Sequence, residues 1–359
     1  MQMRPLFGEE EKKAVCDYMS EDGFITEFKR TEQFENLIAE FTGARHCIVV
    51  NNGTVSLTLA ALAAGIQAGD EVIMPNYTMI ATPNSVKMFG ATPIFADVEP
   101  ETLCLDIVKT RQAITPKTRA IMFVSANGRY PRSGIGAFEQ LANERNLLLI
   151  EDAAQSLGSF YPDGRHIGRA GIIGSFSFSA PKIISTGQGG ALITDDDVLA
   201  TKIRRLKDFG RTSSGNDIHD TIGYNFKFTE LQAVIGIEQM KKLPSRVVRK
   251  KEIWRRYAAN LMGISGISLF DHDLEHTSPW FIDSIVEKRE ALMAHLNGTG
   301  IGTRIMYPPI NRQQAYRIPG DHHVSNRIGQ YGLWLPSAVQ LTDIEIDHIC
   351  TNIREFYHA

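Results

Sequence analysis

An acidic and a basic side chain stand near the ends of apolar segments in the middle of the chain. Asp152 closes the apolar run LLLIED, and Lys182 follows the run SFSF and precedes the glycine-rich turn STGQGG. Open α/β sheets expose their functional groups at the carboxyl ends of the strands. We therefore expect both side chains at one opening in a sheet. Taken alone, Asp152 could equally cap a turn, and a lone lysine is usually solvated.

A third segment is suited to binding phosphate. The run NNGT, residues 51–54, ends an apolar strand and opens a helix, whose free N–H groups and positive dipole end favour an anion. Thr54 could also be only the N-cap of that helix. An acid, a lysine and a phosphate-binding helix end together match the basic nitrogen, the aldehyde and the phosphate of pyridoxal 5'-phosphate. Lys182 would bind its aldehyde, Asp152 its ring nitrogen and Gln155 its ring hydroxyl.

The elements that position these groups alternate along the chain. Apolar runs at residues 46–50, 71–75, 93–98, 119–124 and 147–152 are separated by helical segments, and two further strand-like runs follow at 175–178 and 191–194. This alternation is typical of βαβ units. The sequence therefore predicts an α/β fold with a mostly parallel seven-stranded sheet flanked by helices.

The remaining segments predict a second, smaller unit. We expect an N-terminal helix at residues 8–20, a helix from Thr229 to Leu243 that breaks at Pro244, and a basic helix with a solvated face up to Met262. The pattern of the last hundred residues predicts a small α+β unit. We predict a large cofactor-binding domain at residues 24–240, and a small domain built from residues 1–23 and 241–359.

The composition excludes several classes of function. The 359 residues include 38 Lys or Arg and 41 Asp or Glu, and the net charge of −3 gives no field that would gather nucleic acid or an anionic membrane. The four cysteines are far apart, so neither a zinc site nor a disulfide framework is indicated. No run of 18 apolar residues occurs. We expect a cytoplasmic protein without a metal and without a nucleic-acid or membrane partner.

The order of five segments resembles the DegT/StrS-type sugar aminotransferases of fold type I, over nearly the whole chain. These segments are NNGTVSLTLAALAAGIQAGDEVIMP, EDAAQSLG, SFSFSAPKIISTGQGG, ALITDDD and GYNFKFTELQAVIGIEQM. Among the members, the perosamine synthases, which aminate GDP-4-keto-6-deoxymannose, are most similar in pattern. The resemblance implies pyridoxal phosphate as cofactor and a homodimer with two active sites at the subunit interface.

The resemblance also implies roles for individual residues. Lys182 matches the catalytic lysine that binds the cofactor covalently, Asp152 the partner of the ring nitrogen, and Gln155 the partner of the ring hydroxyl. The implied phosphate ligands are Gly53, Thr54, Ser177 and, reaching the phosphate of the neighbouring subunit, Asn225. Without the resemblance, Ser177 could be a strand hydroxyl that bonds backbone, and Asn225 a turn residue.

Two departures from the family pattern concern the cofactor ring and the acceptor. Met79 stands where relatives usually stack an aromatic residue on the ring, and Tyr77 is offset by two positions. The family's His-x-Tyr-Gly-Gln segment is replaced by residues 125–129, SANGR. We therefore take Met79 as a cofactor contact. The candidates for substrate contacts are Asn127, Arg129 and Arg304.

The predicted reaction is the transfer of an amino group from L-glutamate to a nucleotide-linked 4-keto-6-deoxy sugar. It would give a GDP-perosamine-like product for surface polysaccharide or antibiotic sugar synthesis. The presence of Lys182 favours transamination over the dehydratases of the family, which carry histidine there. Two alternatives stay open. One is an aminotransferase for a smaller phosphorylated ketone, and the other is a regulator that binds the cofactor without turnover.

Overall fold

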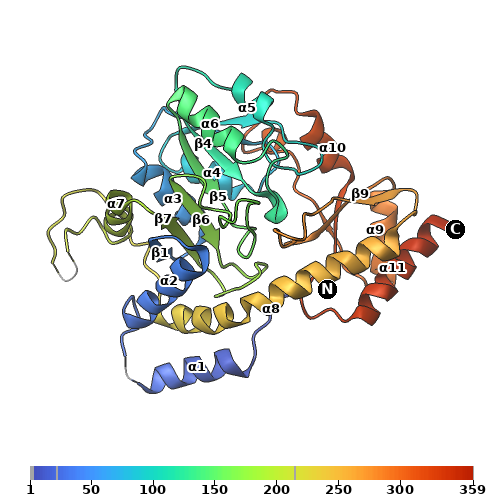
Figure 1. Cartoon of the computed structure of the whole chain (residues 1–359), viewed down its shortest axis with the longest axis horizontal. Helices are drawn as coiled ribbons and strands as arrows, with labels where there is room; N and C mark the ends of the chain where they lie inside the picture. The colour runs from blue at the N-terminus through green and yellow to red at the C-terminus, as the bar shows by residue number, and fades with distance from the viewer. Residues whose placement is uncertain (1–3, 22, 214–215, 359) are drawn as a thin grey trace.

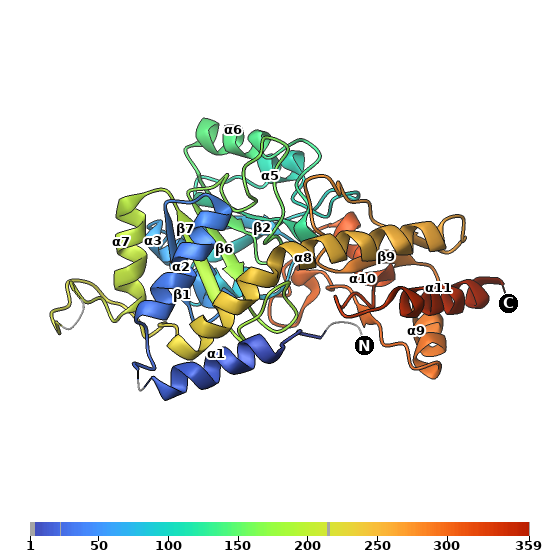
Figure 2. The ribbon, with the colours of Figure 1, turned by 60° about the horizontal axis from the view of Figure 1, so that its bottom comes forward.

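The computed structural model describes residues 4–21, 23–213 and 216–358. It contains a seven-stranded and a four-stranded sheet. Figure 1 shows helices packed around the larger sheet and one long helix that runs from it toward the C-terminal part of the chain. Figure 2, from a second direction, shows the same helix crossing between the two parts.

The larger sheet agrees with the predicted fold class. Its strands are β1 (His46–Val50), β2 (Glu71–Pro75), β3 (Thr92–Ala96), β4 (Thr118–Val124), β5 (Leu148–Asp152), β6 (Ile173–Ser177) and β7 (Gly190–Thr194). Their order is β1-β7-β6-β5-β4-β2-β3. β7 pairs antiparallel with β1 and β6, whereas the other neighbours pair in parallel. The prediction of a mostly parallel seven-stranded sheet is therefore confirmed.

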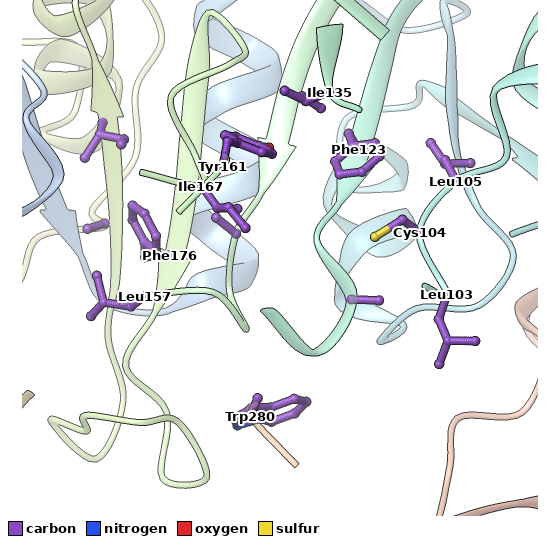
Figure 3. Packing of buried hydrophobic residues seen from close by; sticks show 14 of the residues in the cluster. Leu103, Cys104, Leu105, Phe123, Ile135, Leu157, Tyr161, Ile167, Phe176 and Trp280 are labelled. Atoms are coloured by element: carbon purple, nitrogen blue, oxygen red, sulfur yellow. The ribbon is translucent and has the colours of Figure 1, made fainter. Parts of the chain in front are cut away.

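Both faces of this sheet are buried, because successive side chains of a strand point to opposite sides. In β1, Cys47 and Val49 enter one hydrophobic core, and Ile48 and Val50 enter the other. The first core includes side chains of α2 (Lys29–Thr42), α6 (Gly136–Arg145) and the long helix, and Figure 3 shows part of it. The second core is covered by α3 (Gly53–Ala63), α4 (Ala81–Lys87) and α7 (Asp197–Lys207).

The N-terminal segment contains one predicted and one unpredicted helix. α1 (Glu9–Ser20) matches the expected helix. α2 was not predicted from the sequence, although its buried residues Thr31, Phe34, Glu35, Ile38 and Thr42 follow helical spacing. It packs against the long helix, and so it extends the core beyond the sheet.

The predicted break at Pro244 is wrong. α8 runs without interruption from Glu230 to Leu261, with Pro244 inside it. A proline in a helix interior removes one hydrogen bond and crowds the preceding turn, at a cost of about 3 kcal/mol. Packing against α1, α2 and the last helix of the chain holds α8 on both sides of this position. The predicted domain boundary at residue 240 lies within α8.

The C-terminal part forms a small antiparallel sheet with helices. Its strands are β8 (Ile267–Leu269), β9 (Ile282–Val286), β10 (Arg304–Ile305) and β11 (Gly332–Leu335), in the order β10-β11-β9-β8. The helices are α9 (Arg289–Gly298), α10 (His323–Tyr331) and α11 (Asp343–His358), and the short helices elsewhere are α5 (Ile107–Gln112), η1 (Ala126–Gly128) and η2 (Ile310–Arg312). No helix among the described residues combines the length and apolar character needed to cross a bilayer.

The contact between α2 and α8 gives a test of the fold. A Cβ atom added at Gly236 would lie 2.6–2.8 Å from the Phe34 ring, which is fully buried. We therefore expect Gly236→Ala to lower the free energy of unfolding by about 1–3 kcal/mol, because the ring has no room to move. The urea midpoint measures this change. Gly298→Ala, where a Cβ meets nothing within 4 Å, is the control and should not lower the midpoint. Equal midpoints for the two variants would contradict the packing.

Candidate functional site

A pocket of about 440 Å³ opens at the carboxyl ends of β5 and β6 and the first turn of α3. It brings together seven of the residues that the sequence predicted for the cofactor site: Gly53, Thr54, Met79, Asp152, Gln155, Ser177 and Lys182. Asn51, Asn52, Leu57, Thr78, Ala81, Thr82, Ala154, Ser179 and Gln188 complete the wall.

The first turn of α3 forms one end of the pocket. The cap of this helix is Asn52, whose Oδ1 accepts a hydrogen bond from the Val55 N–H at 2.9 Å, so N-capping does not account for Thr54. The N–H groups of Gly53 and Thr54 precede the first intrahelical donors and are available to an anion. A Cβ atom on Gly53 would lie 2.8 Å from Cβ of Ser177. Glycine is therefore required for the Ser177 hydroxyl to lie beside the helix end.

Asp152, at the end of β5, also lines the pocket. Its Oδ2 accepts from the Thr82 hydroxyl at 2.7 Å, and its Oδ1 accepts from the Ala154 N–H at 3.2 Å. Burial raises the pKa of Asp152, and these two bonds and the Lys182 charge only partly offset it. Both hydrogen-bond donors are uncharged, so the carboxylate has the chemistry to accept a third bond from a cationic ring nitrogen. Thr82 had no recognisable signal in the sequence.

Gln155 is oriented by a backbone group. Its Oε1 accepts from the Asn127 N–H at 2.6 Å, which leaves the side-chain Nε2 as the donor for a ligand. The Asn127 side chain itself is occupied. Its Nδ2 donates to the Phe281 carbonyl at 2.9 Å, and its Oδ1 accepts from the Phe281 N–H at 2.6 Å. Asn127 thus joins η1 to the segment before β9, and it does not line the pocket.

Lys182 reaches the pocket from the connection between β6 and β7. Burial lowers the pKa of Lys182 to about 8, and the opposing charge of Asp152 acts in the other direction. A part of the lysine population is therefore neutral near neutral pH, as a proton acceptor requires.

Met79, and not Tyr77, lies at the pocket wall. The Met79 side chain is 45% exposed, and its sulfur accepts from the Ala81 N–H at 3.0 Å. Tyr77 is buried and packs against Tyr307, with ring centroids 5.9 Å apart. A planar ligand in the pocket would therefore meet a thioether at this position, and Tyr77 is not available for stacking.

Arg129 lies outside this pocket, in a buried ion pair. Its Nη1 and Nη2 donate to the two carboxylate oxygens of Asp283, both at 2.8 Å, and its Nε donates to the Asp271 carbonyl at 2.8 Å. The two side chains of the ion pair are only 4% and 1% exposed. Every guanidinium nitrogen is already bonded, so this geometry gives Arg129 a structural role between the two sheets in place of the predicted acceptor contact.

Arg304 and Asn225 also lie outside the pocket. Arg304 is exposed on β10, and its guanidinium carbon lies 5.5 Å from the centroid of the Trp334 ring. Asn225 is exposed and forms an isolated bridge with Asp208, and the next residue, Phe226, accepts from the Asn51 N–H at 3.2 Å. The predicted roles of both residues stay predictions.

A further group of side chains resembles a metal site. Among the described residues, Asp273, Glu275 and His276 bring ligand atoms within 4.8 Å of one another. Asp273 already accepts hydrogen bonds from Tyr130 at 2.6 Å and from His276 at 2.7 Å. Nothing in the sequence pattern indicated this cluster. The prediction that the protein needs no metal stays a prediction.

The fold and the pocket define a class of enzyme, the fold type I aminotransferases that depend on pyridoxal phosphate. The solved structure of S. venezuelae DesV in complex with a ketimine intermediate is 29% identical, has a TM-score of 0.92, and matches with 100% of both chains covered. That of DesI in the presence of its TDP-sugar product is 29% identical with a TM-score of 0.90, covering 99% of this chain and 91% of DesI.

Residues 5–354 match the DegT/DnrJ/EryC1/StrS aminotransferase family, and the chain belongs to this family. Among curated relatives, GDP-perosamine synthase of Escherichia coli O157:H7 is 36% identical over 358 residues, covering 99% of this chain and 97% of the relative. GDP-perosamine synthase of Vibrio cholerae is 31% identical over 362 residues, covering 97% and 96%. The protein is a transaminase, and its cofactor is pyridoxal 5'-phosphate.

The buried ion pair with Asp283 allows a test of whether Arg129 has a structural role or contacts the acceptor substrate. We expect Arg129→Ala to lower the free energy of unfolding by about 3–5 kcal/mol, because it leaves the Asp283 carboxylate buried without a cation. Chemical denaturation measures this change. Arg132→Ala is the control, because its side chain is 74% exposed and its ion pair with Glu101 lies at the surface. If Arg129→Ala kept its stability and only weakened acceptor binding, the structural role would be wrong.

Proposed function

We propose that this transaminase moves an amino group from L-glutamate to a nucleotide-linked 4-keto-6-deoxy sugar and yields a GDP-perosamine-like aminosugar. The observation that carries the proposal is the single pocket in which Lys182, Asp152, Gln155 and the Gly53–Thr54 helix end face a common space. The sugar substrate is supported by relatives named GDP-perosamine synthase and by the likeness to DesI, whose structure was solved with a TDP-sugar product.

The residues of the pocket fit the cofactor at three points. The N–H groups of Gly53 and Thr54, with the Ser177 hydroxyl, would hold the phosphate. Asp152 would hold the proton on the ring nitrogen, and the free Nε2 of Gln155 would donate to the ring hydroxyl. Met79 would lie against the ring. Bound pyridoxal phosphate supplies an electron sink for the carbon that loses a proton.

Lys182 would move the proton in both halves of the reaction. When it is not bound to the cofactor, its neutral amine would take the proton from the α-carbon of glutamate, and the resulting ammonium group would give that proton back to complete this half of the reaction. The same steps run in reverse on the ketosugar, so the net change converts glutamate to 2-oxoglutarate and the ketone to an amine. The lowered pKa of Lys182, about 8, suits a group that must both accept and release a proton.

The assembly and location belong to the same proposal. We infer a homodimer in which Asn225 of one subunit reaches the phosphate site of the other, and its exposure outside its own pocket supports this arrangement. Residues 24–240 would form the large domain, with residues 1–23 and 241–359 as the small one. The protein would act in the cytoplasm, in agreement with its four free cysteines.

The covalent link to Lys182 can be tested directly. We expect borohydride reduction of the cofactor-loaded protein to leave the pyridoxyl mass on the Lys182 peptide, and Lys182→Ala to lose both this label and turnover. Lys250 offers a matched control. Burial lowers the pKa of Lys250 to about 7, yet its Nζ donates to the Ser337 carbonyl at 2.6 Å, outside the pocket. Lys250→Met should retain the label. A pyridoxyl mass on any other lysine, or on none, would refute the assignment.

The substrate can be tested with a panel of nucleotide-linked 4-keto-6-deoxy sugars and small phosphorylated ketones. We expect glutamate and the GDP-linked sugar to give 2-oxoglutarate and an aminosugar in equal amounts, measured by mass spectrometry, and Lys182→Ala to give neither. If only the small ketones were aminated, the protein would be an aminotransferase for a smaller phosphorylated ketone. A protein that binds the cofactor but leaves glutamate unconverted would be a regulator, and the proposed reaction would be wrong.

A further inference from the structure

Trp280 brings the C-terminal part of the chain against the Lys182 connection. It precedes β9 and is only 4% exposed. Its indole N–H donates to the Pro181 carbonyl at 2.7 Å, so the ring is bonded to the residue directly before the lysine. Figure 3 shows the Trp280 ring below the other labelled side chains of the core.

The Lys182 amine lies over the face of this ring. Its Nζ is 4.1 Å from the centroid of Trp280, within the range in which an indole attracts an ammonium group. A small cleft lined by Gln155, Ser177, Lys182 and Trp280 adjoins the cofactor pocket, and the first three residues line both spaces. The lysine side chain therefore stands between the cofactor site and the indole.

The ring is held in place on several sides. It stacks on Phe281 with centroids 3.8 Å apart, and the Trp334 ring meets it at 67°. The backbone of Phe281 is bonded through both its N–H and carbonyl to Asn127, whose own N–H orients Gln155. One connected set of contacts thus fixes the indole relative to the predicted ring-hydroxyl donor.

We propose that Trp280 is a positioning residue for Lys182, and that its indole face holds the lysine amine whenever the amine is not bound to the cofactor. This inference rests on the proposed function of Lys182. The freed amine would be retained beside the pocket, and would return to the cofactor without a search through other rotamers.

The groups around Lys182 determine the direction in which its pKa should change when the indole is removed. Burial favours the neutral amine, the Asp152 carboxylate on β5 favours the ammonium form, and these effects place the pKa at about 8. A π face also favours the ammonium form. Removal of the ring should therefore lower the pKa of Lys182, by about half a unit to one and a half units.

The experiment uses the full-length protein loaded with pyridoxamine 5'-phosphate, in which the lysine is free. Brief acetylation with acetic anhydride across pH 6–10, followed by peptide mass spectrometry, gives the titration of Lys182. We expect Trp280→Leu to shift the midpoint downward by the stated amount, and Trp280→Phe, which keeps a π face, to restore most of it. Trp254→Leu is the control, because Trp254 donates to the Phe270 carbonyl and faces His272.

A midpoint that is the same in wild type and Trp280→Leu would overturn the proposal. Should Trp280→Leu fail to fold, the pH dependence of tryptophan fluorescence tests the same contact in the intact ring. Wild type should show a transition at the Lys182 midpoint that Lys182→Met lacks, and its absence from wild type would equally overturn the proposal. The borohydride label on Lys182 is measured separately, so that a failure of the proposed function is distinguished from a failure of this inference.

Discussion

Asp152 is a buried carboxylate that receives hydrogen bonds from a hydroxyl and a backbone amide, and the pocket is arranged around it. Burial disfavours its charged form, and two neutral donors do not fully compensate for the lost water. A cation bound in the pocket would complete its coordination. The end of β5, the first turn of α4 that carries Thr82, and the turn at Ala154 all serve to hold this one anion in place. A protonated ring nitrogen in the pocket would therefore supply Asp152 with the charged hydrogen-bond donor that the hydroxyl and the backbone amide do not provide.

The neighbouring residue shows why burial alone does not identify such a group. Glu151 points to the other face of the sheet, because adjacent residues of a strand alternate. Its carboxylate is also fully buried, but it accepts from the Tyr161 hydroxyl at 2.5 Å and from the N–H groups of Gly168 and Gly171, both at 2.9 Å. The protein itself satisfies Glu151, which therefore anchors a loop. Asp152 differs from Glu151 because its carboxylate lines the pocket and accepts hydrogen bonds from only two protein groups, the Thr82 hydroxyl and the Ala154 N–H.

Features that depend on local order were predictable from the sequence, and features that depend on distant partners were not. Apolar strands and a small-residue helix after residue 52 follow from short patterns. α2 was not predicted, although its buried positions have helical spacing, and its buried Glu35 is paired by groups from other segments, the Val49 N–H and Arg204. The continuity of α8 through Pro244 is decided by the helices that pack on it. The ion pair between Arg129 and Asp283 joins residues 154 positions apart, which a single sequence does not reveal.

The reversed direction of β7 has a consequence for Lys182. Because β6 and β7 are antiparallel neighbours, the connection between them leaves and re-enters the sheet at the same end of the strands. Two backbone hydrogen bonds close the base of this connection, from the Phe178 N–H to the Gly189 carbonyl (2.8 Å) and from the Thr186 N–H to the Phe178 carbonyl (3.0 Å). Both strands lie inside the sheet, with neighbours on either side. The lysine is therefore carried by a connection whose two ends join interior strands of the sheet. Amide protons at its base should exchange with solvent only when the whole sheet opens.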